Sequence, residues 1–427
     1  MAAAVASLVA LASAMRVNAT RLGQGCSSDA DCSYNGDCHQ GACRCDAAWD
    51  GASCGNLRLL PASRGSGLRA EDGGQNTSTW GGTVALDNST GKLHMWASEI
   101  AGHCGIAAWK INSFVVSTSL AQMNLSLSLS LSLSLSLSLS RSRFRFLLPL
   151  AVSRRFPEQV HAVAAKDSPD VFSRVDAASH TDVQFPIFTH EPSVSRAPTG
   201  EWVLYWSGYP QNHRLGPPCL NACTDGWTPQ NLSAYGCKLP RGGSPPTFMS
   251  WADCPDGPWS PPVEVLAAPW DTNLAVVILA NGSAVGTARR SGMPVYLVTA
   301  ANWKTPSSYR YHSEKPLLEL PSKTAIEDGS VYLDSAGRFH AIFHSGLDGI
   351  HAFSINGLDW TYGGVAWNNT VQFDDGVVYS FHRRERPHFV FGDASAPHRI
   401  TALTTAVSYG DDGEKDACFT LLQRVNH

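Results

Sequence analysis

The sequence has few charged residues and no excess of positive charge. Charged residues make up 16% of its 427 residues, against roughly 25% in typical globular domains. Lys and Arg together number 32 against 36 Asp and Glu, which gives a formal net charge of −4. Such a chain has no extended positive field for holding nucleic acid or an anionic membrane surface. Binding to nucleic acid or to an anionic membrane is therefore disfavoured.

Long apolar runs and cofactor motifs are also lacking. Beyond the N-terminus, no stretch reaches the roughly 18 uninterrupted apolar residues of a membrane-spanning helix. The sequence contains no Gly-x-Ser-x-Gly nucleophile elbow and no nucleotide-binding loop. We therefore expect no membrane span, no serine triad, no cofactor and no metal.

The N-terminus and the cysteine count indicate a secreted protein. Residues 1–14 are an apolar, Ala-rich run that ends in a small-x-small cleavage pattern, and a second such site lies at 18–19, so residues 1–19 are interpreted as a signal peptide. The alternative is a buried or disordered Ala-rich start. Twelve Cys, an even number, fit an oxidising compartment. Seven Asn-x-Ser/Thr sequons point the same way, at Asn18, Asn76, Asn88, Asn124, Asn231, Asn281 and Asn368.

Half of the cysteines are concentrated near the N-terminus. A segment this short cannot fold on hydrophobic burial alone and needs disulfides; a zinc site is the rival interpretation, but no Cys-x-x-Cys pair is present. The end of the run, CRCDAAWDGASC, resembles an epidermal-growth-factor-like (EGF-like) module, here residues 20–55. The resemblance implies three pairs: Cys26 with Cys38, Cys32 with Cys43, and Cys45 with Cys54. The pairing of the other six stays open: Cys104, Cys219, Cys223, Cys237, Cys254 and Cys418.

The rest of the chain, residues 56–427, is organised by a weak internal repeat. Five segments, starting at Thr83, Ser193, Ala275, Ser330 and Phe389, each read as strand, tight turn and strand. Their second arms nearly alternate apolar and polar residues, as half-buried antiparallel strands do. With 37 Gly and 25 Pro supplying turns, this pattern predicts an all-β fold built by radial repetition.

A low-complexity insert interrupts the first repeat. Leu-Ser alternates from residue 125 to 140, and the tract reads either as an aggregation-prone strand with one leucine face or as a translated DNA repeat. Without residues 114–157, the mean spacing of the hairpins becomes about 65 residues, within reach of a four-stranded blade. We expect five blades that begin near Thr79, Pro186, Trp270, Ile326 and Phe381.

Two segments before predicted hairpins carry a family resemblance. They are His190–Val194 (HEPSV) and Ala325–Gly329 (AIEDG). With them, residues 79–407 resemble the five-bladed β-propellers of family-43 glycoside hydrolases and their arabinanase, levansucrase and invertase relatives. The resemblance implies a carbohydrate-active protein that cleaves a poly- or oligosaccharide with two carboxyl groups in the propeller funnel.

The resemblance implies Glu327 as the catalytic acid. Neighbouring Asp328 would raise its pKa by like-charge repulsion; alternatively the two form a turn or a solvated loop pair. The family's base at the start of blade one has no counterpart in Thr79–Gly82, where Glu71 and Asp72 lie upstream.

Two further carboxylates are candidates. Asn273 occupies the third-blade position that tunes the acid, unless Asp271 takes its place. Glu191 is a substitute for the missing base.

Substrate-binding candidates come from Trp80 and from the segment RRERPH. Arg383, Arg386 and His388 could hold an anionic sugar, because guanidinium groups bind carboxylate and sulfate oxygens in a bidentate manner; the alternative is a solvated strand edge in which Glu385 pairs with an arginine. The histidines His344, His351 and His388 could meet in the funnel, although strand-edge histidines usually bond to backbone.

Two classes of function follow. The protein is either a secreted glycoside hydrolase or a non-catalytic glycan-binding protein in which the EGF-like module serves as spacer or protein contact.

Overall fold

The computed structural model describes residues 25–68, 78–100, 106, 114–116, 161–165, 168–174, 189–208, 245–267, 273–290, 294–320, 324–392, 396–410 and 418–426. The predicted signal peptide, the Leu-Ser tract and the candidates Glu71, Asp72 and Asp271 lie outside these residues. In the part of the chain that is described, no helix is long and apolar enough to span a membrane.

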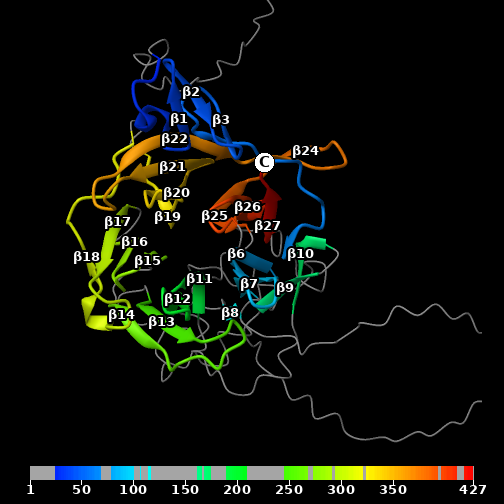
Figure 1. Ribbon diagram of the computed structural model, residues 1–427. Helices are drawn as coiled ribbons and strands as arrows, with labels where there is room; N and C mark the ends of the chain where they lie inside the picture. The colour runs from blue at the N-terminus through cyan, green and yellow to red at the C-terminus, as the bar shows by residue number, and fades with distance from the viewer. Residues whose placement is uncertain are drawn as a thin grey trace, which may run out of the picture.

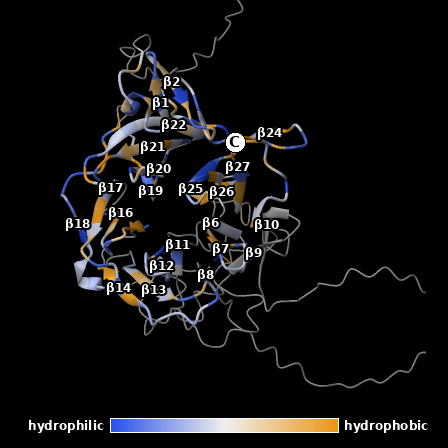
Figure 2. Cartoon of the chain, viewed as in Figure 1, coloured by the Kyte–Doolittle hydropathy of each residue, from blue (hydrophilic) through white to orange (hydrophobic). Residues whose placement is uncertain are grey.

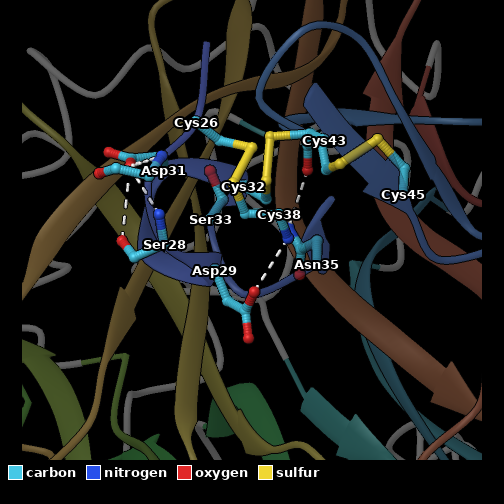
Figure 3. Close-up of a disulfide and its surroundings, with 12 residues drawn as sticks. Cys26, Ser28, Asp29, Asp31, Cys32, Ser33, Asn35, Cys38, Cys43 and Cys45 are labelled. Carbon is cyan, nitrogen blue, oxygen red and sulfur yellow. Dashed lines mark hydrogen bonds between the residues drawn. A yellow bond between two sulfur atoms is a disulfide. The ribbon is translucent and has the colours of Figure 1, made fainter. Parts of the chain in front are cut away.

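The N-terminal segment is a small disulfide-bonded module. Its elements are η1 (Asp29–Cys32), β1 (Gly36–His39), β2 (Ala42–Cys45), β3 (Trp49–Asp50) and β4 (Asn56–Leu57). The predicted pairing is confirmed: the bonds join Cys26 to Cys38 and Cys32 to Cys43 (Figure 3), and Cys45 to Cys54. Asp29 helps to hold the loops together, because its Oδ1 accepts a hydrogen bond from the backbone N–H of Cys38 at 2.9 Å.

Three sheets of four antiparallel strands follow one another along the chain (Figure 1). The first contains β11 (Thr189–Arg196), β12 (Trp202–Gly208), β13 (Thr247–Ala252) and β14 (Val263–Leu266). The second contains β15 (Ala275–Ile278), β16 (Ala284–Arg289), β17 (Val295–Ala300) and β18 (Arg310–Tyr311). The third contains β19 (Glu327–Leu333), β20 (Phe339–Ser345), β21 (Asp348–Ser354) and β22 (Thr361–Asn368).

A nine-stranded sheet joins the first and last strands of the propeller. Its order is β25-β26-β27-β5-β10-β9-β7-β6, with β8 attached to β7. The strands are β5 (Gly67–Leu68), β6 (Ser78–Asp87), β7 (Lys92–Ile100), β8 (Phe114–Val116), β9 (His161–Ala165), β10 (Ser168–Arg174), β25 (Arg383–Phe391), β26 (Ile400–Ser408) and β27 (Cys418–Arg424). The short β5 pairs with β27 on one side and β10 on the other. The strand β5 therefore closes the ring.

The innermost strands surround a common centre. Each of β6, β11, β15, β19 and β25 contacts the next, and β25 contacts β6 again. The predicted propeller arrangement is confirmed, and the five inner strands begin within a few residues of the predicted starts. Among the described residues, the sheets of four or more strands number four rather than five, because β5 merges the first and last sets of strands into one sheet.

The hydrophobic core lies between neighbouring sheets. Val285 and Leu297 on β16 and β17 pack against Val331 and Phe343 on β19 and β20, all of them buried. Burial of such side chains stabilises the fold by about 25 cal/mol per Å² of apolar area. Figure 2 shows hydrophobic stretches in β13 and β16 and a hydrophilic one in β25. The core thus leaves the inner strand ends available to polar residues.

The EGF-like module packs against the third four-stranded sheet, at the top in Figure 1. Trp49 and Leu57 of the module belong to one buried cluster with Trp367 of β22 and Phe389 of β25. The Ser33 hydroxyl donates to the Gly363 carbonyl at 3.2 Å. The module is packed on the propeller rather than held away from it. A further pair, β23 (Thr370–Gln372) and β24 (Val378–Ser380), lies between β22 and β25 in the sequence.

Candidate functional site

Four of the inner strands break their pairing register near the start. The breaks fall between Trp80 and Gly82, His190 and Ser193, Glu327 and Ser330, and Glu385 and His388. Each break contains one residue with left-handed backbone: Gly81 (φ 64°), Glu191 (φ 60°), Asp328 (φ 54°) and Arg386 (φ 58°). Asn273, just before β15, has φ 43°. A β-bulge changes the direction of the side chain it carries. The same kind of bulge therefore recurs around the centre of the ring.

These left-handed residues line a pocket at the centre of the ring. All five inner strands contribute to it, and its empty volume is about 340 Å³, including its solvent opening. The lining residues are Trp80, Gly81, Glu191, Pro192, Ser193, Asn273, Ala275, Asp328, Gly329, Arg386 and His388. Non-glycine residues with positive φ are costly and concentrate at functional sites. The pocket is therefore the candidate site.

Arg386 bridges two buried carboxylates in this pocket. Its Nη2 forms an ion pair with Glu191 Oε1, and its Nε lies 3.2 Å from Asp328 Oδ2. The side chains of Glu191 and Asp328 are only 3% exposed, and that of Arg386 is 11% exposed. Burial lowers the pKa of Arg386 below its usual range, but two adjacent carboxylates keep the guanidinium charged.

Asp328 has two more partners. Asn273 Nδ2 donates to its Oδ1, and His344 Nδ1 lies 3.0 Å from its Oδ2. Burial opposes ionisation of Asp328, yet His344 holds the pKa of this carboxyl below its ordinary value. Burial likewise opposes the charge on His344, yet Asp328 raises the pKa of that imidazole to about 9. Both groups are charged at neutral pH.

The pocket is electrically balanced but incompletely hydrogen-bonded. The cations Arg386 and His344 match the anions Glu191 and Asp328 in number. Among the described residues, Glu191 Oε2, Asn273 Oδ1 and Arg386 Nη1 are buried without a hydrogen-bond partner. Buried polar atoms rarely lack a hydrogen-bond partner. The pocket thus presents both hydrogen-bond acceptors and a hydrogen-bond donor.

Glu327, the predicted acid, lies beside the pocket and does not line it. Its side chain is 16% exposed, and its Oε2 lies 3.1 Å from Arg289 Nη1. Burial, followed by the charge of Asp328, raises the pKa of Glu327 to about 7. One oxygen from each carboxylate and a ring nitrogen of His344 lie within 4.8 Å of one another. Because of the bulge, Asp328 rather than Glu327 lines the pocket.

The three arginines of RRERPH have different environments. Arg383 lies 3.5 Å from Glu385, as in the ion-pair alternative, and does not line the pocket. Arg384 is fully buried and donates to the Asn368 carbonyl at 2.9 Å and to Gln423 Oε1 at 2.8 Å. Only Arg386 reaches the centre. The segment is therefore not a cluster of arginines open to an anion.

The three candidate histidines His344, His351 and His388 do not lie together in the pocket. His388 lines the pocket, and burial together with Arg386 lowers its pKa to about 4. His344 reaches the pocket network through Asp328. His351 instead contacts the EGF-like module, where its ring lies 4.9 Å from that of Trp49.

Of the predicted site residues, the structure brings five together in the pocket lining: Trp80, Glu191, Asp328, Arg386 and His388. Sequence reasoning missed Gly81 as a site residue, although the Gly-Gly pair in a predicted strand was a signal for a bulge. It also missed His190, whose Nε2 lies 3.1 Å from Glu191 Oε1.

Neither a protein-family model nor a curated protein matches the sequence. Solved structures do match in fold. Zg3597, a family 117 glycoside hydrolase of Zobellia galactanivorans, is 11% identical with a TM-score of 0.49, over 87% of this chain and 90% of that one. A protein of unknown function from Dyadobacter fermentans is 10% identical with a TM-score of 0.46, over 86% and 98%. The α-L-arabinofuranosidase PaAbf62A of Podospora anserina, solved with cellotriose, is 13% identical with a TM-score of 0.47, over 87% and 98%.

Proposed function

We propose that this protein is a carbohydrate-active propeller that binds an uncharged sugar unit in the central pocket. One observation carries the proposal: buried, unpartnered polar atoms of Glu191, Asn273 and Arg386 face a pocket whose charges balance. A sugar hydroxyl both donates and accepts hydrogen bonds, so a polyhydroxylated ligand matches this mixture of acceptors and donor.

The charge balance favours a neutral sugar over an anionic one. Arg386 is already paired with two carboxylates, so an added carboxylate or sulfate would enter a site without a free positive charge. Placing an uncompensated charge in a buried site is costly. Trp80 adds an aromatic residue to the pocket lining, and aromatic residues commonly line ligand pockets. The anionic-sugar interpretation of the arginine segment is thus disfavoured.

A glycan array tests the proposal, with neutral oligosaccharides such as cellotriose and xylotriose beside sulfated and uronic-acid-containing ones. We expect retention of neutral glycans. Asn273→Ala should weaken binding about three- to tenfold, the effect of one to two hydrogen bonds. Asn302→Ala, in an exposed turn, is the control and should bind as wild type does. Exclusive binding of anionic glycans, or of none, would overturn the proposal.

Hydrolysis of the bound glycan is the second candidate. The pKa of Glu327, raised to about 7, suits a general acid at neutral pH, and Asp328 lies close by as an ionised partner. If Glu327 is the acid, Glu327→Gln should lower turnover at least about a hundredfold while leaving glycan affinity nearly unchanged. The rate should fall as pH rises through about 7. Release of no product from a bound glycan by wild type would leave the protein as a non-catalytic binder.

Secretion and the extracellular location belong to the same proposal. The three disulfides of the EGF-like module support them, because such bonds persist in oxidising compartments. The sequons at Asn88, Asn281 and Asn368 lie at exposed positions, where glycosylation could occur. Peptide mapping of protein recovered from culture medium, before and after deglycosylation, tests both points.

A further inference from the structure

Of the five left-handed residues that line the pocket, Gly81 is the one without a side chain. It lies on β6, directly beside Arg386 of β25 across the closure of the propeller. A Cβ added at Gly81 would lie 2.9 Å from Cβ, 3.1 Å from Cγ and 3.6 Å from Cδ of Arg386. The first distance is shorter than real Cβ contacts allow, so an added side chain would displace the stem of Arg386.

The stem of Arg386 has little freedom to give way without losing its contacts. Its guanidinium must reach Glu191 of β11 and Asp328 of β19 at once, with Nη2 on the first and Nε on the second. Guanidinium geometry is planar and rigid, so a shift of the stem changes both ion pairs together. The backbone of Arg386 is already in the left-handed region, with φ 58°.

We propose that Gly81 is a positioning residue for the pocket. The absence of a side chain at this position seats the Arg386 stem so that its guanidinium bridges Glu191 and Asp328. The consequence for sugar binding rests on the proposed function, whereas the consequence for the ion pairs does not.

Displacement of Arg386 has a pH signature. Without the guanidinium, Glu191 is a buried carboxylate beside His190, whose ring is neutral because its pKa is well below the ordinary value, so the pKa of Glu191 in the folded state rises. Asp328 keeps the charged His344 at 3.0 Å, with Glu327 also beside it, so the pH signature comes from Glu191. A carboxyl whose folded-state pKa is raised binds a proton more tightly when folded, so its contribution to stability is lost as pH rises through that pKa. The penalty for displacing Arg386 is therefore larger at pH 8 than at pH 5.

The test compares Gly81→Ala with Gly91→Ala. Gly91 has nearly the same backbone strain, with φ 69°, and nothing lies within 4 Å of an added Cβ. Both variants should melt below wild type because of strain. Only Gly81→Ala should show a melting-temperature deficit that grows from pH 5 to pH 8, by at least about 2–4 °C. A melting-temperature deficit of Gly81→Ala that is the same at pH 5 and at pH 8, as expected for Gly91→Ala, would overturn the inference.

A double variant provides the second measurement. Glu191→Gln removes one anion: in the wild-type background it takes a partner from Arg386 and destabilises, but in Gly81→Ala it removes an uncompensated charge and stabilises. This reversal of sign is expected in a double-mutant cycle at pH 8. If Gly81→Ala does not fold, Gly81→Ala/Glu191→Gln should fold. Failure of both, with Gly91→Ala folded, contradicts the proposal.

Binding gives the functional readout. For a neutral trisaccharide that wild type retains, Gly81→Ala should raise Kd at least about tenfold, equivalent to about 1.4 kcal/mol, and Gly91→Ala should not. Unchanged affinity in Gly81→Ala would overturn the positioning role. If wild type binds no glycan, the proposed function fails, while the pH comparison still decides the inference about Gly81.

Discussion

The strand β20 carries two histidines in opposite electrostatic states. His340 lies toward the EGF-like module, and His344, four residues later, lies at the pocket. Burial lowers the pKa of His340, whereas Asp328, against the effect of burial, raises that of His344 to about 9. Similar depth in the same strand therefore gives one neutral and one charged imidazole. The groups beside each histidine therefore determine whether its imidazole is charged.

The neutral site is a hydrogen-bond relay with a single direction. His340 Nε2 lies 3.4 Å from Asp334 Oδ2, and His340 Nδ1 lies 3.0 Å from His351 Nε2. His351 Nδ1 faces Asn35 Nδ2 at 3.5 Å, and the same amide donates to the Cys54 carbonyl at 3.0 Å. Because Asp334 accepts, each neutral ring donates toward it and accepts from the side of Asn35.

The relay and the pocket differ in how completely their polar atoms are hydrogen-bonded. In the relay, each ring nitrogen has a partner, and the chain of bonds fixes the module on the propeller. In the pocket, opposite charges meet at Arg386, and several buried atoms have no hydrogen-bond partner among the described residues. A satisfied network holds parts together, and an unsatisfied one at a cavity is suited to a ligand.

The largest effect should come from removing the central cation. Arg386→Met leaves Glu191 and Asp328 buried without their shared partner, which should destabilise the protein by about 3–5 kcal/mol in urea unfolding at pH 8. Glycan binding should be lost as well. Arg383→Ala, on the same strand with a side chain 33% exposed, should cost only about 0–1 kcal/mol. Similar losses in the two variants would remove the distinction between the pocket and an ordinary ion pair.

Acidification should weaken the relay and not the pocket cation. Burial holds the pKa of His351 well below its ordinary value, and that of His340 is also lowered. The unfolded chain then binds protons that the folded chain does not, so stability falls as pH drops below about 6.5, by up to about 1.4 kcal/mol per pH unit for each histidine. Urea unfolding between pH 7 and 5 measures the summed slope, to which the buried His94, His190 and His388, whose pKa values are also lowered, contribute as well. His351→Gln should reduce it, and an unchanged slope would contradict the relay.

Asn35→Ala should loosen the module while leaving the pocket intact. The variant removes the amide that bonds the Cys54 carbonyl and faces His351, at an expected cost of about 1–3 kcal/mol. Hydrogen exchange should accelerate in residues 26–57 and not in β25. Asn281→Ala, in an exposed turn, is the matched control. Faster exchange in β25 would show that module and pocket are coupled.

Sequence reasoning predicted the repeated part of the fold well. The hairpins are local, so alternation and turn residues revealed them, and cysteine spacing in an EGF-like pattern gave the disulfides. The closure by β5 was not predicted, because two residues pairing with strands far along the chain leave no local pattern. The pocket geometry was missed for a similar reason: Glu191 and Arg386 are residue types that rarely adopt positive φ, and the modest preference of Asn273 and Asp328 for that region does not locate a site in the sequence.

Substitution of Glu327 should give the smallest change in stability, and the sign of its pH dependence distinguishes Glu327 from the paired carboxylates of the pocket. Burial and Asp328 raise its pKa to about 7, above about 4.3 in an unfolded chain. The folded state therefore holds a proton that the unfolded state has released, and stability is lost as pH rises from about 4.3 to 7. Glu327→Gln cannot ionise, so relative to wild type it should gain on the order of 1 kcal/mol between pH 4 and pH 8, the ion pair with Arg289 limiting the gain. Glu314→Gln, at an exposed ion pair with Arg290, should show no such change. A Glu327→Gln variant that instead loses stability as pH rises would mean that Glu327 is an ionised partner of Arg289 and not a proton-holding acid.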